Sequence, residues 1–466
     1  MLADLSNNLK KTVPWRLKRY YMYTFVTVMS LITPWIIING NHFFLFSFDH
    51  KMLNLLFVRF DMQELYLMPF LLVIIFLTIF WLTVTGGRVF CGWICPQTIF
   101  RVVYRDFIET KLLKIRKRIK NKQEEPDYSL PINKVKRVVA ILIWSFLAII
   151  AAMDLGWYFI PPEDFFQYIQ NPSDHPVMIG ALVGLTLFLI ADIVFIKENF
   201  CVYVCPYSRV QSVLYDDDTL MSVYDYKRGG AIYDQSHNLL NTKPKESDAE
   251  CTGCQSCVTV CPTHIDIRKG LQLECINCLE CVDACTTVMG KLGKESLVRW
   301  SSSKEAERHE GKTNLYRPKT VGGAIVLTII FAIMVYVAST KEHMLLSINK
   351  ESRLYIIEKI KDKTLVKNSY VFLFDNTDNE SHKFYFDIVG HDGIKIDRPS
   401  KPFRVGAGFK KKKVVILSTT KQLSSDNRRD TTIPITIRAY ALDNKDEIVV
   451  NREAIFVYPR LDKIKQ

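Results

Sequence analysis

Eight of the twelve cysteines fall into two runs with the same spacing. The runs read Cys251-x2-Cys254-x2-Cys257-x3-Cys261-Pro262 and Cys275-x2-Cys278-x2-Cys281-x3-Cys285. Three cysteines two residues apart wrap one face of an iron–sulfur cubane, and the fourth lies too far along the chain to close the same cluster, so it ligates the other one. A structural zinc module would instead use paired C-x2-C knuckles. We therefore expect two [4Fe–4S] clusters of the bacterial ferredoxin type, one held by Cys251, Cys254, Cys257 and Cys285 and the other by Cys275, Cys278, Cys281 and Cys261.

The remaining four cysteines form two pairs, Cys91-x3-Cys95-Pro96 and Cys201-x3-Cys205-Pro206, which are 110 residues apart. Each pair follows an apolar stretch and precedes a short amphipathic one, where proline suits the first helical turn. If these segments are helical, the i, i+4 spacing places both thiols of a pair on one helix face. Two such pairs, related by an internal repeat, can present four thiolates to one point.

Three chemistries compete for these four thiols. Soft thiolates select Cu(I), four thiolates can hold a third iron–sulfur cluster, and a pair can act as a redox-active dithiol. The plain alternative is buried cysteines that pack like small apolar side chains, and the repeated prolines disfavour it. The candidate catalytic residues and copper ligands are Cys91, Cys95, Cys201 and Cys205.

Five apolar stretches are long enough, at roughly 20 residues each, to cross a bilayer and position these cysteines. They lie near Tyr20–Ile38, Leu65–Thr85, Val138–Tyr158, Val177–Ile196 and Val321–Ala338. The net charge of +13 could indicate a nucleic-acid partner, but the basic residues flank the spans, so a nucleic-acid-binding protein is excluded. The first span follows a basic segment, yet it is too long for a signal peptide and lacks a small-residue cleavage site. We expect it to be a retained anchor.

The loops indicate the orientation through the positive-inside rule. The segment before the first span and the stretch 101–137 are rich in Lys and Arg, whereas the loop 159–176 has neither. We therefore expect a multi-pass protein of the bacterial inner (cytoplasmic) membrane, with a cytoplasmic N-terminus and a periplasmic C-terminal domain. All twelve cysteines then lie at or inside the reducing face, where metal ligands are expected rather than disulfides. Asp192, within the fourth span, is a further candidate because an ionisable group at membrane depth is costly.

The C-terminal part changes character and predicts a β-sandwich. Runs rich in β-branched and aromatic residues recur at 369–374, 383–388, 413–417 and 433–437, with turn residues such as Asp375-Asn376 and Asp443-Asn444 between them. Seven or so strands favour an immunoglobulin-like fold. The basic run Lys410–Lys413 is interpreted as a solvated hairpin end. No cysteine or evident nucleophile is present, so partner binding is favoured over chemistry.

The predicted architecture is an α-helical membrane protein of five transmembrane helices, with an inserted 2[4Fe–4S] ferredoxin domain and a C-terminal all-β immunoglobulin-like sandwich. Residues 1–200 are expected to form a four-helix transmembrane region with the first CxxxCP motif. Residues 201–320 form a cytoplasmic region with the second motif and the ferredoxin domain, at about 245–295. The fifth transmembrane helix is expected at 321–340 and the periplasmic domain at 341–466.

This order of parts resembles the CcoG/FixG/RdxA family of accessory proteins for assembly of cbb-type cytochrome c oxidase. The resemblance rests on the two CxxxCP pairs beside membrane spans, the doubled ferredoxin run, the final span and the cysteine-free tail, and it covers essentially the whole chain. The membrane ferredoxins NapH and NosR share the cysteine motifs. The absence of an N-terminal flavin-binding domain and the presence of a C-terminal outer domain favour the first family.

The resemblance implies a cupric reductase that supplies Cu(I) to the oxidase copper centre. Cys91, Cys95, Cys201 and Cys205 would handle copper, and the expected cofactors are two [4Fe–4S] clusters and copper, with a third cluster as the alternative to copper. The expected partners are the membrane, a cytoplasmic electron donor, and cbb-type oxidase subunits or copper chaperones. Two other functions stay open: an electron-transfer subunit that passes quinol or ferredoxin electrons to a separate reductase, and a non-catalytic assembly scaffold.

Overall fold

A computed structural model of the 466-residue chain describes residues 13–38, 40–50, 52–61, 67–234, 239–241, 243–244, 246–339, 343–360, 363–378, 380–391, 393–424, 426–445 and 447–465. The chain divides into two compact units. Met1–Val58 and Leu65–Val335 form the first unit, and Arg59–Glu64 and Tyr336–Gln466 form the second. The cysteines all belong to the first unit, and the predicted sandwich belongs to the second.

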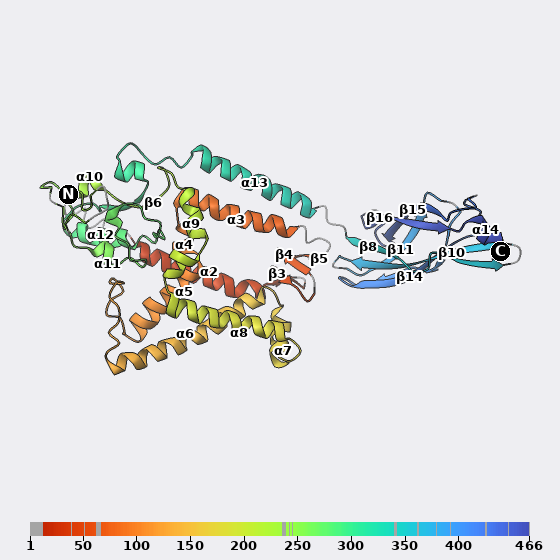
Figure 1. Ribbon diagram of the computed structural model, residues 1–466, viewed down its shortest axis with the longest axis horizontal. Coiled ribbons are helices and arrows are strands. Elements are labelled where there is room, and N and C mark those ends of the chain that lie inside the picture. Colours follow the sequence, from red (N-terminus) through yellow and green to blue (C-terminus); the bar gives the residue numbers. More distant parts are fainter. Residues whose placement is uncertain are drawn as a thin grey trace. The chain divides into compact units, whose positions relative to one another are not determined.

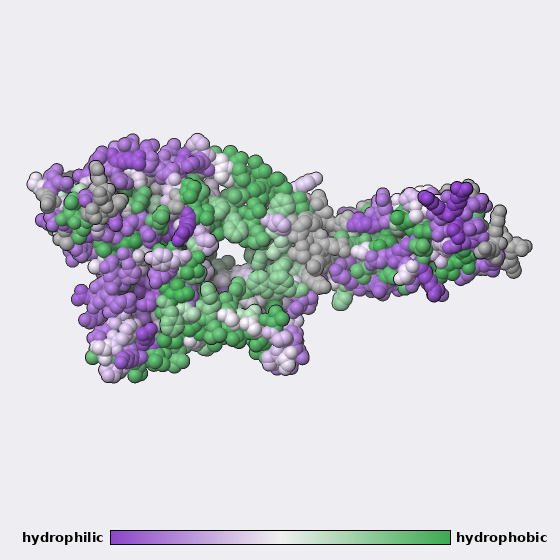
Figure 2. Space-filling model, in the orientation of Figure 1, coloured by the Kyte–Doolittle hydropathy of each residue, from purple (hydrophilic) through white to green (hydrophobic). Residues whose placement is uncertain are grey.

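Long helices traverse the first unit side by side (Figure 1). They are α2 (Trp15–Ile32), α3 (Leu67–Gly86), α6 (Pro131–Trp157), α8 (Pro176–Ala191) and α13 (Pro318–Ser339). Helices α6, α8 and α13 each begin at a proline, whose fixed φ suits the first helical position. Among the described residues, α3, α6, α13 and the stretch Pro176–Ile196 are long and apolar enough to cross a membrane. Their exposed faces form the hydrophobic zone of the unit (Figure 2).

The first predicted span is the exception. Helix α2 ends at Ile32 and is followed by a 3-10 turn, η1 (Thr33–Trp35), and the short strand β1 (Ile37–Ile38). It is not among the four apolar helices because its first turns carry Arg16, Lys18 and Arg19. It nevertheless runs alongside α6, since Ser30 Oγ donates to Asp154 Oδ2 at 2.5 Å. Within the described residues the prediction of five apolar spans is therefore corrected to four, with α2 as a further long helix whose N-terminal end is polar.

Short elements join the long helices. On the loop between α2 and α3 lie β2 (Asn41–His42), β3 (Phe44–Ser47), β4 (Met52–Leu55) and β5 (Val58–Asp61), and α7 (Pro162–Gln170) joins α6 to α8. Around the cysteines the elements are α4 (Val89–Trp93), α5 (Pro96–Val102), π-helical η3 (Val103–Leu112), π-helical η4 (Asp192–Ile196), π-helical η5 (Phe200–Val204), α9 (Tyr207–Val210), η6 (Gln211–Val213), β6 (Met221–Tyr224), α10 (Tyr226–Gly229), α11 (Ser256–Thr259), η7 (Ile267–Lys269), α12 (Glu280–Lys291), β7 (Val298–Ser301) and η8 (Ser303–Glu307). Strands β6 and β7 pair antiparallel, with Met221 opposite Ser301.

The second unit is a two-sheet β structure, as predicted. Its strands are β8 (Met344–Lys350), β9 (Ile356–Ile360), β10 (Lys363–Asn376), β11 (His382–Val389), β12 (Lys395–Arg398), β13 (Phe403–Val405), β14 (Lys410–Thr419), β15 (Thr431–Ala441) and β16 (Val449–Tyr458), followed by α14 (Leu461–Lys465). One sheet has the order β12-β14-β10-β8 with β9 also paired to β10, and the other has the order β13-β11-β15-β16. Inward-facing aromatic side chains fill the core between them: Phe372 and Phe386 have ring centroids 5.1 Å apart.

One local prediction in this unit is wrong. Asp375 and Asn376, expected in a turn, are the last residues of β10. Asn376 is buried and its Nδ2 donates to the carbonyls of Glu380 and Gly406 at 2.7 and 3.0 Å. Such an asparagine satisfies the backbone of a neighbouring turn from the strand, without itself turning. The Lys410–Lys413 run opens β14, and Lys410 pairs with Asp375 at 2.6 Å.

Candidate functional site

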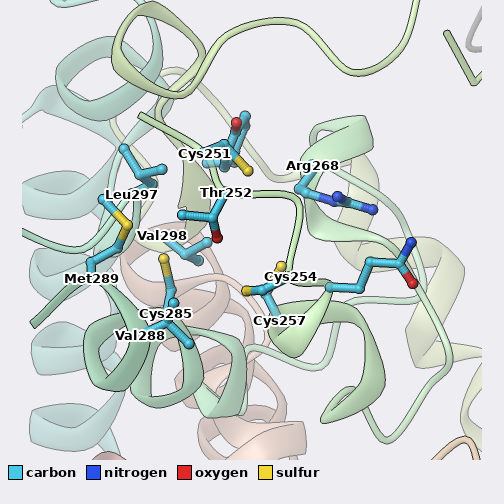
Figure 3. Close-up of a pocket in the computed structure, with 12 residues that line it drawn as sticks. Cys251, Thr252, Cys254, Cys257, Arg268, Cys285, Val288, Met289, Leu297 and Val298 are labelled. Atoms are coloured by element: carbon cyan, nitrogen blue, oxygen red, sulfur yellow. The ribbon is translucent and has the colours of Figure 1, made fainter. Parts of the chain in front are cut away.

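The first predicted cluster set surrounds one cavity. Cys251, Cys254, Cys257 and Cys285 line a hollow of about 370 Å³ together with apolar side chains such as Val288 and Met289 and with Arg268 (Figure 3). Cys285 reaches it from α12 and Cys257 from α11, while Cys251 and Cys254 come from the loop before α11. A hollow lined by four thiols fits a [4Fe–4S] cluster, whose four corners each need one thiolate.

The second set surrounds a neighbouring cavity. Cys261, Cys275, Cys278 and Cys281 line a hollow of about 330 Å³, and Cys257 of the first set also touches it. The two cavities are therefore adjacent. Burial raises the pKa of Cys275 to about 12, so the protein alone holds this thiol protonated and cluster binding must release its proton. Cys254, the most exposed of the eight, has a lowered pKa: burial acts to raise it, but hydrogen bonds from Ser256 outweigh that effect.

Local backbone geometry explains the tight cysteine loops. Gly253 and Asn277, each just before the second cysteine of its run, have φ of +70° and +52°, and Gln255 and Leu279, each just after it, have φ of +57° and +60°. Left-handed residues on both sides of a cysteine turn the chain sharply enough to bring three thiols to one face. The repetition of this pattern shows that the two runs fold alike.

The structure also places the four CxxxCP thiols near one another, although within the described residues no three of them are grouped closely enough to hold a single metal ion. Each of Cys91, Cys95, Cys201 and Cys205 interacts electrostatically with the other three. Burial raises the pKa of Cys91 and of Cys201 to about 12, and the neighbouring thiols add to the rise. Asp192 is buried and interacts electrostatically with Cys95, so it belongs to the same site.

The two thiols of a pair do not share a continuous helix, which corrects the helical-face prediction. Helix α4 ends at Trp93, and Cys95 has extended backbone angles before α5 begins at Pro96. In the second pair, η5 ends at Val204 and Cys205 is likewise extended. The proline after each pair is the reason, because it disfavours helical geometry in the residue before it. Equivalent bonds close both turns, from Cys95 N to Phe90 O and from Cys205 N to Phe200 O, each at 2.9 Å.

Polar pairs cross between the two repeats. Arg88, three residues before Cys91, is buried and its Nε donates to Gln211 Oε1 at 2.6 Å. Glu198, three residues before Cys201, accepts from Arg101 Nη2 at 3.0 Å. Gln211 and Arg101 each lie six residues after the second cysteine of their own pair, so the same two positions pair reciprocally. Gln211 Nε2 also lies 3.6 Å from Cys91 Sγ, within hydrogen-bonding reach of a sulfur.

The first CxxxCP loop packs directly against the loop of the second cluster set. Trp93 Nε1 donates to the carbonyl of Asn277, between Cys275 and Cys278, at 3.3 Å. A Cβ on Gly92 would lie 2.5 Å from Ile276 O, so this position requires glycine. Asn277 Nδ2 in turn donates to Gly86 O at 2.8 Å, at the end of α3. These contacts hold the first CxxxCP loop against the loop of the second cluster set.

Several known families and proteins each match a part of this chain. Residues 196–303 match the 4Fe-4S dicluster domain family, residues 68–120 a 4Fe-4S binding domain family, and residues 334–459 the Ig-like fold at the C-terminus of FixG. Protein RdxB of Cereibacter sphaeroides is 31% identical over 50% of this chain and 47% of its own length. Nitrogen fixation protein FixG of Rhizobium meliloti is 28% identical over 60% of this chain and 54% of its own length. The chain is thus similar to proteins named FixG, RdxA and RdxB over about half of its length.

A further curated protein and a solved structure also match parts of the chain. Protein RdxA of Cereibacter sphaeroides is 25% identical over 57% of this chain and 55% of its own length. The chain thus spans about half the length of the curated relatives it matches. The crystal structure of a FixG-related protein from Vibrio parahaemolyticus is 15% identical, with a TM-score of 0.20, and covers 25% of this chain and 98% of that one. At that TM-score it adds nothing to the argument.

Gly92 provides a direct test of the packing between the two loops. We expect Gly92→Ala to lower the melting temperature and to loosen the second cluster site, because its Cβ meets a backbone oxygen that cannot move aside. The loss should be about 1–3 kcal/mol of stability, as for other overpacked sites. The measurement is the thermal loss of iron–sulfur absorbance in the purified chain. Gly184→Ala is the matched control because nothing lies within 4 Å of its Cβ, and equal effects of the two changes would contradict the assigned packing.

A buried ion network joins the ferredoxin-type region to the helices. Arg19 Nη1 lies 3.2 Å from Glu280 Oε1, and Lys122 Nζ contacts both Glu280 and Asp106. The network continues through Arg105 to Glu198. Burial acts to raise the pKa of Glu198, but Arg101 and Arg105 outweigh it and lower that pKa to about 2. These charges hold α12 against α2 and η3, so they fix the position of the second cluster loop.

Removal of one charged side chain from this ion network should leave an uncompensated buried charge. We expect Lys122→Met to cost about 3–5 kcal/mol, as for other broken buried pairs. The control is Lys117→Met, because Lys117 is 83% exposed and lies 3.8 Å from Glu124; surface pairs contribute about 0–1 kcal/mol. The thermal midpoint for loss of the iron–sulfur absorbance is measured for both variants. A Lys122→Met midpoint no lower than that of Lys117→Met would show that the ion network does not stabilise the packing of the ferredoxin-type region against the helices.

Several site residues were not identified from the sequence. Gln211, Asn277 and Gly92 carry the contacts around Cys91, yet nothing in their residue type marks them. One signal was available for the crossed pairs: aligning the two CxxxCP motifs puts Arg88 level with Glu198 and Arg101 level with Gln211.

Proposed function

We propose that this chain is a membrane-bound iron–sulfur electron-transfer protein that reduces Cu(II) to Cu(I) at Cys91, Cys95, Cys201 and Cys205. The contact between Gly92–Trp93 and Ile276–Asn277 is the observation that carries the proposal. It joins the loop of the second cluster set to the four-thiol site through the Trp93 side chain, which donates to a backbone carbonyl, and through the close packing of Gly92 against Ile276 O. When bound, the two [4Fe–4S] clusters supply electrons one at a time.

The residues of the thiol site have three tasks in this reaction. The thiols lose their protons as copper binds, and the thiolates then favour Cu(I) over Cu(II) because sulfur is a soft ligand. Gln211 holds Cys91 in place by its side-chain amide, and Arg88 holds Gln211. The surrounding helices leave the four thiols only partly exposed. One electron received by Cu(II) gives Cu(I), with no other bond made or broken.

We also propose the membrane placement and the partners. The basic stretch 101–137 lies on the same side as the cysteines, which supports a cytoplasmic position for the ferredoxin-type region. A cytoplasmic donor then supplies electrons. Cu(I) passes to copper chaperones or to subunits of a cbb-type oxidase during its assembly, as the family resemblance implies, with the C-terminal sandwich as a periplasmic partner-binding domain.

A single-turnover experiment tests the proposed reaction. The anaerobic protein is reduced, freed of excess reductant and mixed with chelated Cu(II), and Cu(I) is trapped by a colorimetric ligand. About two Cu(I) per chain should form as two clusters each lose one electron. Clusters that stay reduced in the presence of Cu(II) would contradict the proposal.

One observation favours a second candidate, a third iron–sulfur cluster at the four thiols. The 4Fe-4S binding domain family matches residues 68–120, which contain Cys91 and Cys95 but neither ferredoxin run. Among the described residues no three His, Cys, Asp or Glu side chains form a group that could hold a single metal ion. The four thiols would need to draw together around one copper ion, whereas a cluster spans a wider gap. In that case the chain passes electrons onward and does not handle copper.

A further inference from the structure

A wide cleft opens beside the first cluster cavity, on the side of α11 and α12. It has a volume of about 1130 Å³ and lies between the start of α2, the loop Arg118–Asn121 and the two cysteine-bearing helices. The loop is held there by bonds from Lys122 N to Thr259 O at 2.8 Å and from Gln123 Nε2 to Val258 O at 2.9 Å. The cleft is thus a built feature of the ferredoxin-type region.

The accessible charge of the cleft is basic. Arg16, Arg118, Lys120 and Lys291 line it, and within the described part of the chain none of the four pairs with an acidic side chain. Two acidic residues also line it, and one of them, Glu280, is buried and paired with Arg19 and Lys122. Asp283 accepts the backbone N–H groups of Trp15 and Arg16 at 2.9 and 2.8 Å. Four cations therefore remain to attract an anionic partner.

One side chain separates this cleft from the first cluster cavity. Val288 of α12 lines both hollows, and Figure 3 shows it next to Cys285. Cys257 on α11 follows Ser256, which also lines the cleft. A redox group placed in or over the cleft would thus lie near the first cluster, with Val288 between them.

We infer that this cleft is the docking site of an acidic one-electron carrier protein, of the ferredoxin or flavodoxin class, that reduces the first cluster. The inference deepens the proposed electron-transfer function and rests on it. A hydride donor such as a reduced nicotinamide delivers two electrons together and needs a flavin to split them, whereas a one-electron carrier matches the cluster directly. The carrier loses one electron, the cluster gains it, and no proton moves.

The position of the cleft favours a carrier over an anionic lipid headgroup. Its walls are the cysteine-bearing helices, and the pole of the unit that they occupy is hydrophilic, whereas the apolar zone lies over the long helices (Figure 2). Ser256, Thr259 and Thr287 supply polar uncharged lining, which suits a protein rim.

Stopped-flow reduction of the full chain in neutral-lipid nanodiscs tests the inference. The reductant is a pre-reduced acidic [2Fe–2S] ferredoxin, and copper is absent, so the result does not depend on the copper reaction. Lys120→Glu with Lys291→Glu reverses two exposed cleft charges, and Lys134→Glu with Lys312→Glu makes the same change in net charge at exposed sites outside the cleft. The iron content and the EPR signal after chemical reduction check that all variants retain their clusters.

We expect the cleft variant to be reduced at least about tenfold more slowly at low salt, with a weaker dependence on ionic strength, because steering changes rates by about 10–10³-fold. The control variant should stay within about twofold of the wild type. Equal rates for the two variants would overturn the inference. So would a cleft variant that loses affinity for anionic-lipid vesicles while its reduction by ferredoxin stays at the wild-type rate, since the cleft would then bind lipid headgroups.

Discussion

Cys91→Ser combined with Cys205→Ser should abolish cupric reduction, with the single-turnover yield of Cu(I) falling at least about 100-fold, since soft thiolate ligands are what select Cu(I). One thiol is removed from each repeat, and these two thiols interact with each other in the folded protein. A serine hydroxyl is a hard, protonated oxygen and does not stabilise Cu(I). The eight ferredoxin-type cysteines are untouched, so iron content and the EPR signal of the reduced clusters should equal those of the wild type.

The matched control for this experiment lies in the same segment. Val204→Ser introduces a hydroxyl next to Cys205 at a side chain that is 55% exposed, and it leaves all four thiols in place. It should reduce copper at the wild-type yield. If the double cysteine variant keeps its clusters and still gives the wild-type yield of Cu(I), copper is reduced elsewhere, and the assignment of these thiols fails.

The second large effect concerns two cysteines of the same run. We expect Cys261→Ala to remove the cluster also held by Cys275, Cys278 and Cys281, and Cys254→Ala to remove the other one, because the cavities divide these residues in that way. Each variant should hold about four irons instead of about eight. Mössbauer and EPR spectra of the two variants should therefore report different remaining clusters.

The two variants should also differ in copper reduction. The second cluster loop contacts the CxxxCP loop, so Cys261→Ala should stop Cu(I) formation, whereas chemically reduced Cys254→Ala should still give about one Cu(I) per chain from its one remaining cluster. If Cys261→Ala does not fold, Cys261→Ser keeps an oxygen ligand, and its effect is read from which cluster signal changes. The same cluster lost in both variants would contradict crossed ligation.

Much of this arrangement could be predicted because it depends on local spacing. The two ferredoxin runs predict which cysteines meet, since cluster geometry dictates the ligand spacing, and the structure gathers each predicted set round its own cavity. The runs of apolar residues predict α3, α6, α8 and α13 because only burial in lipid accommodates so long an uncharged stretch. Runs rich in β-branched and aromatic residues predict β10, β11, β14 and β15, because such side chains pack well on a pleated sheet surface.

The features that were missed depend on contacts between distant parts of the chain. Arg88 meets Gln211 across 123 positions, and Asn277 meets Gly86 across 191. Helix α2 was predicted as an apolar span because its C-terminal half is hydrophobic, whereas its N-terminal half is anchored by Arg19, which donates to Cys278 O at 2.6 Å. The extended geometry of Cys95 and Cys205 could have been predicted, since each precedes a proline, but the four-residue spacing suggested a helix.

The metal content of anaerobically purified protein tests the central claim most directly. Iron and sulfide are counted and Cu(I) is titrated in the wild type and in a variant with Cys91→Ser, Cys95→Ser, Cys201→Ser and Cys205→Ser. The account predicts about eight irons in both proteins, as for two [4Fe–4S] clusters, with copper bound by the wild type alone. About twelve irons in the wild type, falling to about eight in the variant, would contradict it and place a third cluster at the CxxxCP thiols.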